Sequence, residues 1–153
     1  MPTTQITAEH PDSPDALQML TELDEGLSVL PYPQESRHAF SVEKLIRENV
    51  AFFVTRQDGV PAGCGGVLLV GTEYGEVKRM FVRPQFRGLG LGKQMLAHLA
   101  EYTHGRGIAL LRLETGIYQP EAIRLYERFG FRRIGPFGLY REDPISIYFE
   151  KEI

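Results

Sequence analysis

The chain contains a single cysteine, Cys64, so it cannot form an internal disulfide. This cysteine lies in a run of small residues from Ala62 to Gly66, and no base is visibly paired with it. We therefore expect a small buried residue rather than a catalytic thiol. The first residues include no basic segment and no apolar run long enough for a signal peptide or a membrane span. These absences predict a cytoplasmic protein that binds no membrane.

The four histidines, His10, His38, His98 and His104, are scattered and show no spacing typical of metal ligands, so we expect no metal site. The sequence also lacks internal repeats and low-complexity tracts. Its net charge of −3 argues against nucleic-acid binding, which normally requires a basic stripe. The same charge is compatible with a cationic amine substrate.

What the chain does contain is ordinary for a compact enzyme. Its 153 residues are 42% hydrophobic and 24% charged, which suits one domain with a substantial core. We expect a single domain over residues 1–153.

Hydrophobic periodicity and turn signals predict an alternation of strands and helices. Strands are expected at residues 5–8, 51–54, 66–70, 77–82, 109–114 and 146–151. A strand is also expected to pass through Gly75. Helices are expected at residues 13–23, 42–47, 91–102 and 120–129. Ser13 is the expected N-cap of the first helix, Asp58 and Gly59 form a hairpin turn, and Gly130 closes the last helix.

The most informative segment is the glycine-rich run from Arg87 to Lys93, which lies between the strand at 77–82 and the helix at 91–102. Glycines let a ligand approach the backbone closely, and the following helix points unpaired N–H groups at the loop. A P-loop is excluded because Arg87 occupies its first glycine position and Gln94 follows the lysine. A dinucleotide fingerprint is excluded because Lys93 occupies its third glycine position. The run therefore predicts a cradle for the phosphates of another cofactor.

Arg87, Gly90 and Gly92 fit the pattern Arg-x-x-Gly-x-Gly directly after a strand. This pattern resembles the signature of the GNAT superfamily, the acyl-CoA-dependent N-acetyltransferases. Residues 76–82 also resemble the family's fourth strand, and residues 122–131 resemble its late helix-to-strand turn. The similarity is clear over residues 51–151 and weak over the first fifty residues. Residues 112–116, 119–122, 136–138 and 143–144 further resemble a group of small bacterial acetyltransferases.

The resemblance implies an α+β fold, an α/β sandwich with a central, mostly antiparallel mixed sheet of about six to seven strands and about four flanking helices. Residues 51–151 would form the acyl-CoA-binding core and residues 1–50 the acceptor side. The implied reaction transfers the acetyl group of acetyl-CoA to a primary amine of a small molecule, by direct attack within a ternary complex. Many relatives are dimers, and residues 137–140 could contribute apolar surface to a homodimer.

The cofactor-binding residues implied by the resemblance follow one another along the strand and the loop. Backbone groups of Met80, Phe81 and Val82 would hold the pantetheine arm. The pyrophosphate would be bound by the loop residues Arg87, Gly88, Leu89, Gly90, Leu91, Gly92 and Lys93.

Three further basic residues, Lys78, Arg79 and Arg83, would place positive charge around this loop. A solvated strand edge is the alternative for Lys78 and Arg79. Gln119 stands where many relatives have an asparagine that contacts the thiol-bearing arm of the cofactor. This departure leaves the contact open.

Acyl transfer to an amine needs a base for the amine, a stabilised oxyanion and an acid for the leaving thiolate. Glu76 is the candidate base, because a subset of the family carries its base at this strand position and alternation would place it on one face with Lys78 and Met80. A surface glutamate is the alternative. Tyr126 is the candidate acid and a cofactor contact, because the family uses a tyrosine in Leu-Tyr-Glu at this helix; a core tyrosine is the alternative.

The acceptor is the least determined part of the prediction. A cationic amine could be attracted by Glu22, Asp24, Glu25 and Glu35, whereas Arg37 and His38 could hold a carboxylate. Glu114, Tyr140 and Arg141 are further candidates for the acceptor pocket. Two other functions stay open: an acyl-CoA sensor without turnover, and acetylation of a protein lysine or N-terminus.

Overall fold

A computed structural model describes residues 2–34 and 40–153 of the chain. Its elements are, in order, β1 (Thr4–Ala8), α1 (Pro14–Ser28), α2 (Val42–Arg47), β2 (Ala51–Gln57), β3 (Val60–Val70), β4 (Tyr74–Val82), η2 (Pro84–Phe86), α3 (Leu91–His104), β5 (Leu110–Gly116), α4 (Pro120–Phe129), β6 (Arg132–Ile134) and β7 (Ser146–Glu152). Seven strands of the described chain form one sheet in the order β1-β2-β3-β4-β5-β7-β6. All neighbours are antiparallel except β4 and β5, so the predicted mixed α+β sheet flanked by four α-helices is confirmed.

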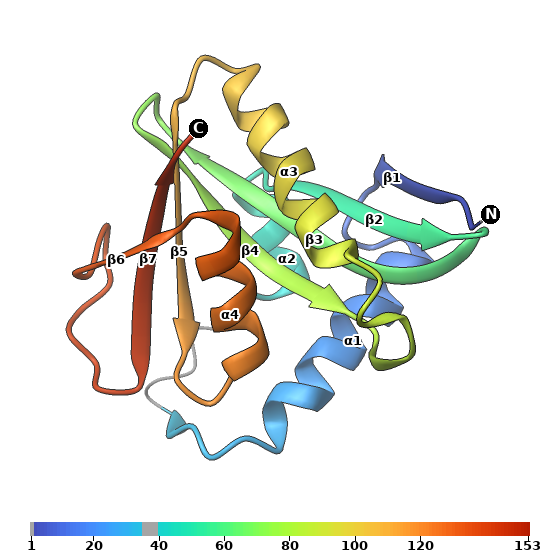
Figure 1. The fold of residues 1–153 in the computed structure, drawn as a ribbon, viewed down its shortest axis with the longest axis horizontal. Helices are drawn as coiled ribbons and strands as arrows, with labels where there is room; N and C mark the ends of the chain where they lie inside the picture. Colours follow the sequence, from blue (N-terminus) through green and yellow to red (C-terminus); the bar gives the residue numbers. More distant parts are fainter. Residues whose placement is uncertain (1, 35–39) are drawn as a thin grey trace.

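The helices cover the two faces of the sheet in pairs (Figure 1). On one face, Met95, Leu96 and Leu99 of α3 pack with Tyr126 of α4 in a core of buried apolar side chains. On the other face, α1 and α2 enclose a second core that includes Met19. Burial on both faces fixes the register of the central strands, because a slip of one residue would exchange the two cores.

The local signals for the helices are confirmed where they were predicted. The side chain of Ser13 caps α1 by accepting a hydrogen bond from the N–H of Ala16 at 3.1 Å. Gly130 ends α4 with φ 105°, a left-handed conformation that favours glycine. Helix α1 continues to Ser28, five residues past its predicted end at Leu23, because no glycine cap or proline stops it there.

β4 and β5 diverge into a fork (Figure 1). Their described pairing is limited to Gly75 with Leu111 and Glu76 with Arg112. Beyond Glu76, the edge of β4 that faces β5 is open, while its other edge stays paired with β3 as far as Val82. The fork therefore leaves unpaired backbone groups in the middle of the sheet, where a bound molecule can satisfy them.

A bulge in β4 exchanges the faces of the strand at Arg79, which has φ 56°. Before the bulge, Glu76 lies opposite Leu68, which packs against the core under α1 and α2. After it, Met80 packs against the core under α3. The predicted common face for Glu76 and Met80 is therefore wrong, because the bulge adds one residue to the alternation.

None of the helices in residues 2–34 and 40–153 combines the length and the apolar character that crossing a bilayer requires.

Candidate functional site

Two cavities meet in the fork between β4 and β5. We call the larger one, about 680 Å³, the loop cavity, because the glycine-rich loop lines it. The smaller one, about 220 Å³, is the fork cavity, which lies between α1, β4, β5 and the segment before β7. Both are lined by Leu23, Leu27, Met80, Gln119 and Tyr126. A ligand in one cavity can therefore approach a ligand in the other at these side chains.

The glycine-rich loop forms one wall of the loop cavity. Gly88 and Gly90 have φ of 82° and 79°, and Gly90 is the N-cap of α3 without a side chain to cap the helix. The first N–H groups of α3 are thus available to an anion, and the helix dipole adds positive potential. These features fit a phosphate group. Gly92 is also needed for packing, since a Cβ there would lie 2.8 Å from Cδ2 of Leu125.

The positive charges divide between the two cavities rather than gathering at the loop. Arg87 and Lys93 line the loop cavity, together with Arg128 of α4, which the sequence analysis missed. Lys78 and Arg79 line the fork cavity, so their predicted place around the phosphate loop is wrong.

Arg83 forms a two-point ion pair with Glu22, at 2.9 and 3.0 Å, and is not among the residues that line either cavity. Its predicted place beside the phosphate loop is therefore not supported. Leu89, predicted as a loop contact, is 54% exposed and lies outside the lining, whereas Leu91 lines the loop cavity and is buried.

The open edge of β4 can hold an extended chain. Met80, Phe81 and Val82 all line the loop cavity. On the opposite edge, Phe81 and Val82 pair with β3, and the backbone polar groups of this stretch that point away from β3 face the fork. An arm containing amides, such as pantetheine, could pair with this edge as another strand would. The side chain of Arg87 already donates from Nε to the carbonyl oxygen of Val82 at 3.1 Å, which ties the loop to the strand.

Tyr126 lies where the two cavities meet. Only 6% of its surface is exposed, and its ring packs against Phe131 and Phe149 at centroid distances of 5.8 and 6.1 Å. Burial, and secondly the negative charge of Glu114, raise the pKa of its phenol. Tyr126 is therefore part of the core and part of the cavity lining at once, and its phenol stays protonated at neutral pH.

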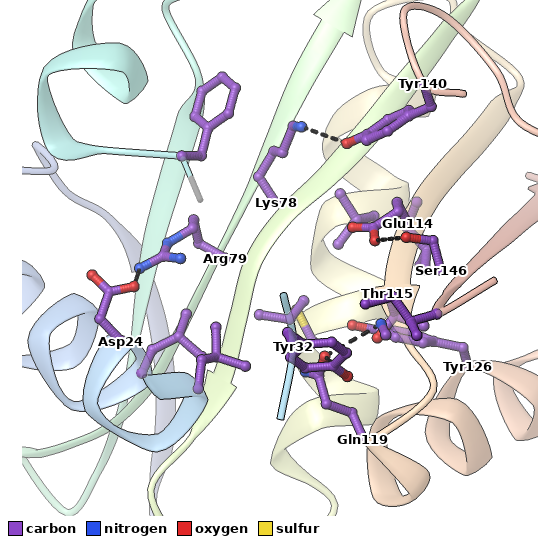
Figure 2. Close-up of a pocket in the computed structure, with 18 of the residues that line it drawn as sticks. Asp24, Tyr32, Lys78, Arg79, Glu114, Thr115, Gln119, Tyr126, Tyr140 and Ser146 are labelled. Carbon is purple, nitrogen blue, oxygen red and sulfur yellow. Dashed lines mark hydrogen bonds and ion pairs between the residues drawn. The ribbon is translucent and has the colours of Figure 1, made fainter. Parts of the chain in front are cut away.

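The two candidate carboxylates have different positions. Glu76 is 6% exposed, pairs with Lys78 at 2.8 Å and accepts a hydrogen bond from Tyr140 at 2.6 Å. Lys78 and Tyr140 line the fork cavity, and Glu76 is absent from that lining. Glu114 lines the cavity and accepts a hydrogen bond from Oγ of Ser146 at 2.9 Å (Figure 2). Of these two carboxylates, only that of Glu114 is among the residues that line the fork cavity.

Gln119 is engaged within the protein. Its Oε1 accepts hydrogen bonds from the N–H of Gly116 and from the hydroxyl of Tyr32, both at 3.3 Å. The Tyr32 hydroxyl also accepts from the N–H of Tyr118 at 2.9 Å, so Tyr32 fastens the segment after α1 to the turn between β5 and α4 (Figure 2). The place of Tyr32 in the site could not be predicted from the sequence, because nothing local links it to Gln119, 87 positions away.

The remaining acceptor candidates separate clearly. Asp24 and Tyr140 line the fork cavity, whereas Glu22, Glu25 and Arg141 do not. Glu35, Arg37 and His38 lie outside the described residues.

Cys64 is buried, and its Sγ donates to the carbonyl oxygen of Arg79 at 3.3 Å. Burial raises the pKa of this thiol to about 12, which leaves no thiolate for catalysis. The predicted small buried residue is confirmed. Within the described ranges no group of three or more histidine, cysteine or acidic side chains is placed to hold a metal ion.

Known proteins resemble the chain in both sequence and fold. Residues 17–131 match the sequence profile of the Acetyltransferase (GNAT) family. The chain is 41% identical over 155 aligned residues to an IAA acetyltransferase from Azospirillum brasilense, with 100% of both proteins covered. A crystal structure from Klebsiella pneumoniae, assigned as an acyl-CoA N-acyltransferase, matches 98% of this chain and 97% of its own with a TM-score of 0.83 and 33% identity. PaiA N-acetyltransferase from Thermoplasma acidophilum, crystallised with coenzyme A, shares the fold with a TM-score of 0.79, 19% identity and 99% coverage of both chains.

The sequence match spans most of the chain, and the glycine loop, the open edge of β4 and Tyr126 stand together in one fork. The chain is an acyltransferase and belongs to the GNAT acetyltransferase family.

Proposed function

We propose that this protein transfers the acetyl group of acetyl-CoA to a primary amine of a small molecule within a ternary complex. The observation that carries the proposal is the meeting of two cavities at Tyr126. One cavity has an anion cradle and an open strand edge for the cofactor. The other has a carboxylate, Glu114, facing the place where an amine would lie.

The size of the fork cavity favours a small acceptor. Its volume is only about 220 Å³, against about 680 Å³ for the loop cavity. Tyr32, Phe40 and Tyr140 form aromatic walls around this space. A compact amine fits these dimensions better than a folded protein surface.

The chemistry assigns a role to each group at the junction. An alkylamine has a pKa of about 10.4, so it arrives mostly as an ammonium ion. Glu114 accepts a proton from it, directly or through water, and the freed lone pair attacks the thioester carbonyl carbon. A backbone N–H of the open β4 edge would stabilise the oxyanion. The C–N bond forms and the attacking nitrogen loses its second proton to water, while the C–S bond breaks. The thiolate takes a proton from the Tyr126 phenol, which recovers one from solvent.

The raised pKa of Tyr126 sets a condition on the last step. Transfer to a thiolate of ordinary pKa, about 8.5, would be uphill from a buried phenol. Burial of the leaving thiolate in the same fork raises its pKa as well, which narrows the gap. Tyr126 thus acts as a hydrogen-bond donor to the developing negative charge and as the proton source when that charge is greatest.

The proposal is tested by measuring free-thiol release from acetyl-CoA against a panel of amines, amino acids and polyamines. Cys64 contributes no background, since it is buried and its pKa is raised to about 12. Release that depends on one acceptor class, with an equal amount of acetylated amine by mass spectrometry, is the expected result. Tight acetyl-CoA binding without release against the whole panel would favour the sensor function instead.

A further inference from the structure

Tyr32 is fixed at both ends of its side chain. Its backbone N–H donates to the carbonyl oxygen of Leu30 at 2.9 Å, in the segment after α1. Its hydroxyl accepts a hydrogen bond from the N–H of Tyr118 at 2.9 Å and donates one to Oε1 of Gln119 at 3.3 Å (Figure 2). The rings of Tyr32 and Tyr118 also pack together, with their centroids 5.0 Å apart. The Tyr32 ring therefore spans the distance between the segment after α1 and the turn after β5.

Gly116, the last residue of β5, lies directly against this ring. A Cβ atom added to Gly116 would lie 1.9 Å from the hydroxyl oxygen of Tyr32, 2.3 Å from its Cζ and 2.5 Å from its Cε1. The backbone of Gly116 is not in the left-handed region, so its conformation does not demand glycine. What requires glycine at this position is the close approach of the Tyr32 ring.

The Tyr32 ring forms one wall of the fork cavity. Tyr32, Thr115, Gly116 and Gln119 all line this cavity, and Gln119 also lines the loop cavity. The ring therefore stands on the side of the fork cavity that adjoins the turn between β5 and α4. Two hydrogen bonds and an aromatic contact would have to break before the ring could swing aside. A ring held in this way resists a bulky ligand, because making room for the ligand would force the ring out of its packed position.

We propose that Tyr32 determines how bulky an acceptor amine can be, and that Gly116 is glycine so that the ring can take this position. The acceptor is then a slender amine, because a bulky substituent would collide with the Tyr32 ring. This inference rests on the proposed acetyl transfer and narrows its substrate class. Tyr32 selects by shape, so its role does not depend on the ion pairs that already engage Lys78 and Arg79.

Analogues that join the cofactor to an acceptor test this size limit without turnover. Each analogue is coenzyme A with its sulfur alkylated by CH2-CO-NH-R, where R is ethyl in the slender analogue and 2-naphthylethyl in the bulky one. Calorimetric titration gives the affinity of each. We expect the wild type to bind the bulky analogue about tenfold or more weakly than the slender one, because the naphthyl group meets the Tyr32 ring. Tyr32→Ala should remove most of this difference.

Gly116→Ala perturbs the same wall independently. Its methyl group must displace the Tyr32 ring, so the ratio of the two affinities should differ from that of the wild type. In the Tyr32→Ala background the same methyl group no longer meets the ring, so Gly116→Ala should leave the ratio of that background unchanged. Gly135→Ala is the matched control, since nothing lies within 4 Å of its Cβ position and Gly135 lines neither cavity. This control should keep the wild-type ratio.

Thiol release from acetyl-CoA with ethylamine and with 2-naphthylethylamine extends the test to turnover. Tyr32→Ala should raise kcat/KM for the bulky amine relative to the slender one by about tenfold. Equal affinity of the wild type for the two analogues, or a difference that persists in Tyr32→Ala, would overturn the role of Tyr32 and leave acetyl transfer intact. A difference that disappears in Tyr32→Ala would support this role even where neither amine releases thiol, in which case acetyl transfer to these amines would fail alone.

Discussion

Tyr126 is the residue whose role is easiest to isolate, because phenylalanine keeps its ring packing and removes only the hydroxyl. We expect Tyr126→Phe to lower kcat by about 10²- to 10⁴-fold, the usual contribution of an acid catalyst. Acetyl-CoA affinity and the melting temperature should stay close to those of the wild type, since contacts with Phe131 and Phe149 remain. Steady-state thiol release and a thermal melt check this. An unchanged kcat would make Tyr126 a core residue only.

Substitution of Glu114 and of Glu76 tests which of these carboxylates accepts the proton of the amine. Glu114→Gln should lower kcat/KM for the amine at neutral pH and shift activity toward alkaline pH, where more of the amine is already neutral. Glu76→Gln should leave that pH profile in place, because Glu76 contacts Lys78 and Tyr140 rather than the cavity. The test is the pH profile of kcat/KM for both variants. A drop in kcat/KM confined to Glu76→Gln would identify Glu76, rather than Glu114, as the base.

The raised pKa of the Cys64 thiol should make the free energy of unfolding depend on pH. Its folded pKa is raised from 9.0 to about 12, so the folded state holds a proton that the unfolded state releases above pH 9. Its contribution is therefore complete below pH 9 and is lost as pH rises toward 12, by up to about 1.4 kcal/mol per pH unit. Urea unfolding of the wild type and Cys64→Ala from pH 7 to 11 should show the difference between them shrinking above pH 9. Parallel curves would contradict this assignment.

At the scale of elements, the loop before α3 carries the cofactor prediction. Gly90→Val should weaken acetyl-CoA binding by at least tenfold, since a branched side chain at φ 79° strains the loop and obstructs the N-terminus of α3. Gly59→Val is the control: it has φ 81° and open space around its Cβ position, as Gly90 does, but lies in the turn between β2 and β3. Calorimetric affinities for acetyl-CoA should fall in the first variant alone. Equal affinity of the two variants for acetyl-CoA would contradict the prediction that this loop binds the cofactor phosphates.

Some features of the helices and strands could be predicted from the sequence, and others could not. The N-cap at Ser13, the glycine stop at Gly130 and the cradle at Gly88 and Gly90 were predictable, because capping and left-handed backbone depend on a few adjacent residues. The bulge at Arg79 was not, because it depends on how β4 pairs with β3. The loss of alternation after this bulge is why Met80 was placed on the wrong face.

The positions of the basic side chains could not be predicted from the sequence for a related reason. Lys78, Arg79 and Arg83 are close to the loop in sequence, but the fork directs the first two into the smaller cavity and Glu22 binds the third. Likewise Tyr32 reaches Gln119 only through the folded chain. Contacts over such sequence separations need the sheet topology before they can be inferred.

At the scale of the whole molecule, a homodimer and a cytoplasmic location stay predictions. Of the apolar surface expected at residues 137–140, Phe137 is buried against Tyr74 and Tyr148, and Leu139 is fully exposed at 100%. We expect a dimer in sedimentation equilibrium of the wild type, and a shift toward monomer in Leu139→Asp. A wild-type monomer across the micromolar range would reject the dimer, and an unchanged dimer in the variant would place its interface elsewhere.

We infer that the fork between β4 and β5 binds acetyl-CoA through the loop from Arg87 to Lys93. The most direct measurement is calorimetric titration of acetyl-CoA into the wild-type protein. We expect saturable binding at one site per chain, weakened by added salt because phosphate contacts are electrostatic. Absence of binding at millimolar acetyl-CoA would contradict the claim and the functions that depend on it.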